Sequence, residues 1–156
     1  MKTSIKITKS PLLAEMTASY KSKINKEDRV TVTQSKDIYN YFVSVWNDDR
    51  IEYVEDSKVI LLNKKNEILG WVSLSGGCVD GVMLDKKVIF QHALLANASS
   101  VILAHNHPSG NTTPSEQDIT VTKDIIKAGK IIGINVLDHI IVTTNGYTSL
   151  MDQGCI

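Results

Sequence analysis

Short apolar runs and segments with helical periodicity alternate along most of this chain, and this alternation constrains the fold more than any other feature. Ser100–Ala104 and Asn135–Thr143 are apolar runs bounded by polar residues, a pattern typical of buried strands. Between them, a helix is expected from about Ser115 to Lys127, ending near Gly129. The alternation predicts an α/β fold, a layered domain with a central mixed β-sheet flanked by helices.

Other elements follow from local patterns. Lys58–Asn63 and Ile68–Ser75 are expected to form a hairpin, with Gly76-Gly77 ending its second strand. Ser35 is expected to cap a helix. The apolar positions of that helix recur at helical spacing and are Ile38, Tyr41, Phe42, Val45 and Trp46. The remaining predicted elements are a strand at Val79–Met83, a helix from the cap Asp85 through about Ala96, and a strand at Tyr147–Leu150 after the turn Asn145-Gly146.

Length and charge bound the domain organisation. A chain of 156 residues is long enough for one domain with its own core. We expect residues 1–30 to form a basic, loosely packed arm and residues 31–156 to form a single domain. Seventeen basic residues balance seventeen acidic ones, so no bulk field attracts the chain to nucleic acid or to a membrane.

Neither an export signal nor a membrane span is expected from this sequence. Its apolar runs are far shorter than the roughly 20 residues that cross a bilayer, and its first residues lack the apolar segment of a secretory signal. Cys78 and Cys155 are too few and too widely separated for a disulfide framework. A cytoplasmic protein is therefore expected.

The pattern that carries chemistry is His105-x-His107, followed by ten residues and Asp118. In an extended segment the two histidines point the same way, and they are expected just past the end of a buried strand. Asp118 falls in the first turn of the predicted helix, from which it can face them. Two imidazoles and one carboxylate leave a fourth tetrahedral position for water, the arrangement of catalytic zinc. The sequence therefore predicts a Zn²⁺ site.

Each of these residues also has a simpler explanation. Ser115 and Asp118 have the spacing of a capping box, so Asp118 can serve only the helix start. A single histidine near a strand end is more often a hydrogen-bonded polar residue than a ligand. Only the combination of two histidines, a turn and a returning carboxylate favours a metal. His139, in the strand pattern VLDHIIV, can support a metal-bound histidine, but a hydrogen-bonded core residue explains it equally well.

The stretch ILAHNHPSGNTTPSEQD resembles the JAMM signature of the MPN metalloprotease superfamily, and with VLDHIIV after it resembles the RadC-like branch. The resemblance covers roughly Glu52 to the C-terminus. It implies a JAMM/MPN fold with zinc held by His105, His107 and Asp118, and it implies that Ser115 stabilises an oxyanion.

The resemblance also implies an upstream glutamate that moves a proton between the zinc-bound water and the leaving group. Glu55 is the expected residue, because it lies at the entry to the strand that contains Val59–Leu62. Glu52 is its rival, and either can be only a solvated residue of an acidic loop.

Two features limit what can be transferred from the superfamily to this chain. RadC-like chains usually carry an upstream helix-hairpin-helix segment, and the first fifty residues do not match one. Asn106 between the histidines is usual in the RadC-like branch, whereas deubiquitinating enzymes favour Ser or Thr there, so isopeptidase activity does not transfer directly.

The function expected first is a zinc-dependent hydrolase of the JAMM type, a metallopeptidase that cleaves an amide or isopeptide bond of a peptide or protein substrate through a zinc-activated water. The alternative is a non-catalytic, metal-stabilised module associated with DNA repair or DNA metabolism. Nucleic acid is a weakly supported partner, and no membrane partner is expected. A zinc nucleobase deaminase is excluded because the chain has neither His-x-Glu nor PCxxC.

Overall fold

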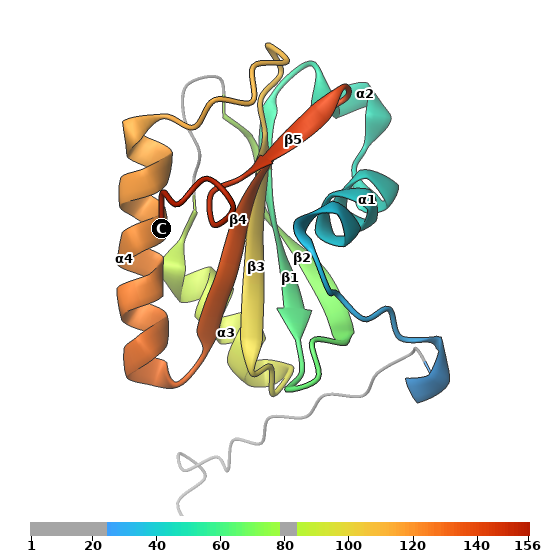
Figure 1. Ribbon diagram of the computed structural model, residues 1–156, viewed down its shortest axis with the longest axis vertical. Coiled ribbons are helices and arrows are strands. Elements are labelled where there is room, and N and C mark those ends of the chain that lie inside the picture. The colour runs from blue at the N-terminus through green and yellow to red at the C-terminus, as the bar shows by residue number, and fades with distance from the viewer. Residues whose placement is uncertain (1–24, 79–83) are drawn as a thin grey trace, which may run out of the picture.

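The computed structural model describes residues 25–78 and 84–156 (Figure 1). The helical elements are η1 (Lys26–Asp28), α1 (Ser35–Val45), α2 (Asp48–Ile51), α3 (Lys86–Leu95) and α4 (Glu116–Ile132). The strands are β1 (Glu55–Leu62), β2 (Ile68–Cys78), β3 (Ser100–Asn106), β4 (Asn135–Thr143) and β5 (Gly146–Ser149). The predicted strand Val79–Met83 and the first 24 residues of the predicted arm lie outside the described residues.

One five-stranded sheet with the order β2-β1-β3-β4-β5 forms the centre of the fold. β3 and β4 are parallel and connected through α4, whereas the other neighbouring pairs are antiparallel. Figure 1 shows α1 and α2 on one side of the sheet and α3 and α4 on the other. The predicted α/β layered domain with a mixed sheet is therefore confirmed.

β3 lies at the middle of the sheet and is buried along its whole length. Its side chains alternate between two cores, as the pleat of a strand requires. Ile102 and Ala104 pack with residues of α1, and Val101 and Leu103 pack with residues of α3 and α4. The next residue, His105, continues the α4 side, and Asn106 continues the α1 side.

Two predicted helix ends differ from the observed ones. α1 is capped by Gln34 rather than Ser35, because Gln34 and Asp37 form the reciprocal bonds of a capping box. α4 runs past Gly129 to Ile132 and ends at Gly133, whose φ of 79° suits a glycine C-cap. Gly129 therefore lies inside the helix, at a position where a Cβ would collide with the backbone oxygen of Ile134.

Two strand ends also differ from the predicted ones. β1 begins at Glu55, three residues before the predicted start, and β2 continues through Gly76 and Gly77 to Cys78. Gly76 and Gly77 lie where the register of β2 against β1 shifts, between the pairs Glu55–Cys78 and Ser57–Ser75. A glycine inside a strand often marks such an irregularity, which explains why Gly76 and Gly77 do not end β2. None of the helices in the described part of the chain has the length and apolar character that crossing a bilayer requires.

Candidate metal centre

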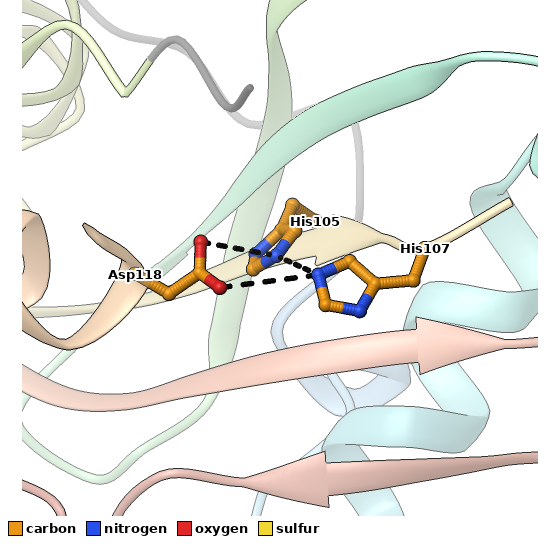
Figure 2. A group of neighbouring side chains, drawn as sticks. All are labelled: His105, His107 and Asp118. Carbon is orange, nitrogen blue, oxygen red and sulfur yellow. Dashed lines mark hydrogen bonds and ion pairs between the residues drawn. The ribbon is translucent and has the colours of Figure 1, made fainter. Parts of the chain in front are cut away.

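The structure brings His105, His107 and Asp118 together at one end of the sheet (Figure 2). His105 lies within β3, which runs one residue further to Asn106, so the prediction that both histidines follow the strand is wrong for His105. His107 comes directly after the strand. Asp118 lies in the first turn of α4 and points back toward both imidazoles.

The potential ligand atoms of these three residues all lie within 4.8 Å of one another. The Nε2 atoms of His105 and His107 are 2.9 Å apart. Asp118 approaches with Oδ1 at 3.4 Å from Nε2 of His105 and with Oδ2 at 3.9 Å from Nε2 of His107. Ligand atoms about 2.1 Å from a tetrahedral zinc ion lie roughly 3.4 Å apart. The observed separations bracket that value, so this donor set can hold a metal ion.

Ser115 and Asp118 form a capping box at the start of α4, and this role is compatible with the place of Asp118 among the candidate metal ligands. Ser115 caps α4, since its hydroxyl oxygen accepts from the backbone N–H of Asp118 at 3.1 Å. Oδ2 of Asp118 in turn accepts from the backbone N–H of Ser115 at 2.7 Å and from its hydroxyl at 2.6 Å. The capping box therefore holds the carboxylate in the orientation that faces the histidines.

Glu55 and Glu52 are placed differently. Glu55 lines a pocket of about 340 Å³ together with His107, Ser115 and Asp118. Ser109, Asn111, Thr113 and Gln117 complete its lining. Glu52 is not part of that lining, and its Oε1 accepts a hydrogen bond from the hydroxyl of Thr144 at 2.9 Å. The pairing of β1 with β3 explains the difference, since Ser57 lies opposite His105 and Glu55 precedes it by two residues.

Asn106 is a residue whose structural role the sequence did not indicate. Its side chain is fully buried on the side of the sheet opposite His105. Oδ1 accepts from the backbone N–H of Asp56 at 2.7 Å, and Nδ2 donates to the carbonyls of Ile51 and Val54 at 2.7 and 2.8 Å. Asn106 thus joins β3 to the loop that leads into β1, directly beside Glu55.

His139 also contacts the site, although the sequence did not decide between a core and a supporting role. It is fully buried on β4, where Leu103 is its neighbour on β3. Its Nε2 lies 2.7 Å from Nδ1 of His105, and its Nδ1 lies 2.6 Å from the hydroxyl oxygen of Thr122 on α4. The only signal in the sequence was a histidine within an apolar strand pattern.

Burial controls the protonation of the two inner histidines. It lowers the pKa of His105 to about 4, with nearby Asp118 opposing the shift and His107 adding to it. Burial, together with His105 and His107, also holds the pKa of His139 well below the usual value. Both imidazoles are therefore neutral near neutral pH, which is the form that binds metals.

The metal-free protein is expected to lose stability as pH falls. In the unfolded chain His105 takes up a proton near its ordinary pKa of 6.5, whereas the folded protein resists protonation down to about 4. The unfolded state therefore binds more protons in this window, and acid favours it. His105 alone should cost about 2 kcal/mol between about pH 7 and about pH 5. Urea unfolding of chelator-treated protein at both pH values measures this loss, and equal stability at the two values would contradict it.

Comparison with known proteins agrees with this geometry. Residues 32–155 match the family model of the RadC-like JAB domain. A UPF0758 protein from Desulforamulus reducens is 40% identical over 83% of this chain and 56% of its own length. A UPF0758 protein from Symbiobacterium thermophilum is 42% identical over 66% of this chain and 44% of its own length. One from Clostridium beijerinckii is 35% identical over 92% of this chain and 62% of its own length.

The chain spans about half the length of the curated relatives that it matches. The matched region nevertheless contains the whole candidate metal centre, including Glu55, Asn106 and His139. The family match covers more than three quarters of the chain, and it agrees with the mixed sheet and with the His-His-Asp cluster. The chain therefore belongs to the RadC-like JAB domain family.

Proposed function

We propose that this chain is a zinc-dependent hydrolase of the JAMM type that cleaves an amide or isopeptide bond. The observation that carries the proposal is that Glu55 lines the same pocket as His107, Asp118 and Ser115. A carboxylate beside an open metal position is the arrangement that adds water to a carbonyl group. Family membership supports the proposal, because the resemblance implies three metal ligands, a serine and an upstream glutamate, and these are the residues found at this site.

The donor set favours zinc. Two imidazoles and one carboxylate are ligands of catalytic zinc sites, which keep a fourth position open. His105 is fully buried, whereas His107 is 15% exposed on its side chain and lines the pocket. The pocket therefore reaches the site from the His107 side. When bound there, zinc would polarise a substrate carbonyl and lower the pKa of a water molecule toward about 7.

The remaining chemistry falls to the side chains of the chain itself. Glu55 accepts a proton from the attacking water and delivers it to the leaving nitrogen. Ser115 has one hydroxyl proton, which it donates to Asp118 in this structure. Stabilising an oxyanion requires that proton to turn from Asp118 to the substrate oxygen. The small polar residues of the pocket lining suit hydrogen bonds to an extended peptide backbone, which supports a peptide or protein substrate.

Glu55→Gln tests the proposal. The variant should retain zinc, because Glu55 is outside the His-His-Asp cluster, and should lose about a hundredfold or more in turnover. The matched control is Glu52→Gln, three residues away in the same acidic segment but bonded to Thr144 instead of lining the pocket. Turnover is measured with zinc-loaded protein on a panel of peptides and isopeptide-linked peptides.

The results separate the two functions that the sequence allowed. Turnover by the wild type and by Glu52→Gln, but not by Glu55→Gln, supports the hydrolase. If the wild type and Glu55→Gln are equally inert on the panel while zinc raises the melting temperature of both, the catalytic role is lost. The non-catalytic, metal-stabilised module would then account for the site.

A further inference from the structure

We propose that His139, oriented by Thr122, is a positioning residue that keeps His105 protonated at Nδ1 and its Nε2 lone pair directed at the metal position. The inference deepens the proposed function in that it concerns the same metal centre. It rests on the direction of three consecutive hydrogen bonds that join α4, β4 and β3.

Thr122 determines which atoms donate and which accept in these hydrogen bonds. The hydroxyl of Thr122 lies 2.5 Å from the backbone carbonyl oxygen of Asp118. A carbonyl oxygen can only accept, so Thr122 donates its single hydroxyl hydrogen to Asp118. The same hydroxyl oxygen lies 2.6 Å from Nδ1 of His139. With its hydrogen already committed, Thr122 can only accept there, and Nδ1 of His139 must carry the proton.

The protonation of His139 in turn determines which ring nitrogen of His105 is protonated. His139 is fully buried, and its two ring nitrogens face Thr122 and His105, neither of which offers a negative charge to hold a second proton. A neutral imidazole has one N–H, so Nε2 of His139 is an acceptor. Nδ1 of His105 lies 2.7 Å away and must donate to it. His105 therefore presents an unprotonated Nε2.

The other histidine is held in the same form by a different group. Nδ1 of His107 lies 2.6 Å from the carbonyl oxygen of Asn111, which can only accept, so His107 is also protonated at Nδ1. Two Nε2 lone pairs thus face each other at 2.9 Å, beside the carboxylate of Asp118. Three acceptors that converge in this way repel one another, and a shared cation relieves the repulsion.

The alternative tautomer shows what His139 prevents. If His105 carried its proton on Nε2, it would donate that proton to Nε2 of His107 and close the metal position with an internal hydrogen bond. His139 and Thr122 exclude this state by requiring a donor at Nδ1. Because Thr122 binds the backbone of Asp118, the same hydrogen bonds also fix the helix turn that supplies the carboxylate. The position is thereby prepared for a metal before one binds.

The tautomers can be observed directly in the metal-free protein. The chain has only four histidines, so long-range ¹H–¹⁵N correlation spectra of the imidazole rings can be assigned by single substitutions. We expect His105, His107 and His139 all to be protonated at Nδ1 near neutral pH. In Thr122→Val the acceptor for His139 is lost, and His105 should show a mixture of tautomers. A metal-free wild type with His105 protonated at Nε2 would overturn the proposal.

Zinc affinity provides the second measurement, by competition with a chromogenic chelator. His139→Phe should weaken binding about tenfold to a hundredfold, the usual cost of losing the partner of a metal-bound histidine. Thr122→Val should weaken it by a smaller factor. Thr122→Ser, which keeps the hydroxyl, should stay within about twofold of the wild type. His92→Phe is the matched control, because His92 is a half-buried histidine on α3 that bonds to the carbonyl of Val88.

The outcomes are separable from those of the hydrolase test. Unchanged affinity in folded His139→Phe and in Thr122→Val would refute the positioning role even if the enzyme is active. If His139→Phe does not fold, the zinc affinities of Thr122→Val and Thr122→Ser still test the positioning role, because only Thr122→Val removes the hydroxyl. Conversely, a protein inert toward every substrate can show the expected tautomers and affinities, because neither measurement depends on turnover.

Discussion

Replacing His107 with alanine is expected to weaken zinc binding on the order of a thousandfold, more than the tenfold to hundredfold lost with an outer partner. His107 offers one of the three candidate ligand atoms of the cluster. It follows the end of β3 and lines the pocket, so its truncation enlarges an open pocket instead of leaving a closed cavity in the core. The variant should therefore fold, and chelator competition on the folded protein should report the loss of a ligand.

The choice of His107 over His105 keeps this test free of a folding defect. His105 is fully buried, and truncating it would leave a cavity and deprive His139 of its partner. His92→Ala is the control, because it removes an imidazole elsewhere and should leave zinc affinity unchanged. Affinity of the His107 variant within about tenfold of the wild type would show that His107 is not a ligand.

The second large effect is expected from Asn106→Ala, which should destabilise the metal-free fold by about 3 kcal/mol. The truncation removes the side chain that bonds the backbone N–H of Asp56 and the carbonyls of Ile51 and Val54, in two buried hydrogen bonds and one partly buried one. Each unsatisfied buried group costs about 1 kcal/mol or more. Urea unfolding of chelator-treated protein measures the change.

Asn135→Ala is the matched control for that measurement. Asn135 is exposed at the start of β4, and its truncation should change stability by less than about 0.5 kcal/mol. A loss for Asn106→Ala no larger than that of the control would contradict its role as a buried link. Because Asn106 bonds the residue next to Glu55, the folded fraction of the variant should also turn over more slowly than the wild type.

The metal-ligand cluster could be predicted from sequence because its parts are close along the chain. His105 and His107 share a strand end, and Asp118 returns in the first turn of the next helix. Local rules of strand alternation and helix capping bring these three residues together with little help from the rest of the fold. The same rules explain why Asp118 can act as a helix cap and as a candidate ligand at once.

The ends of α4 and β2 differ from those predicted from the sequence, and they show the limit of local rules. Gly129 would end many helices, but here it lies inside α4 at a position where Ile134, Phe90 and Val136 leave no room for a side chain. Gly76 and Gly77 remain in β2 at a shift of its register against β1, where the ladder resumes at the pair of Glu55 with Cys78. In both places the glycine meets a requirement of its surroundings, close packing in α4 and a register shift in β2, and does not mark the end of an element.

The sequence by itself determined the fold class, the family resemblance and the three candidate ligands. Only the tertiary structure put Glu55 rather than Glu52 beside them, joined Asn106 to the β1 entry, and turned His139 toward His105. These placements depend on how β1 and β4 are aligned with β3. A shift of one residue in either alignment would move the side chains of the shifted strand to the other face of the sheet. The alignments join segments that are far apart in the sequence, so they are decided when those segments pack together.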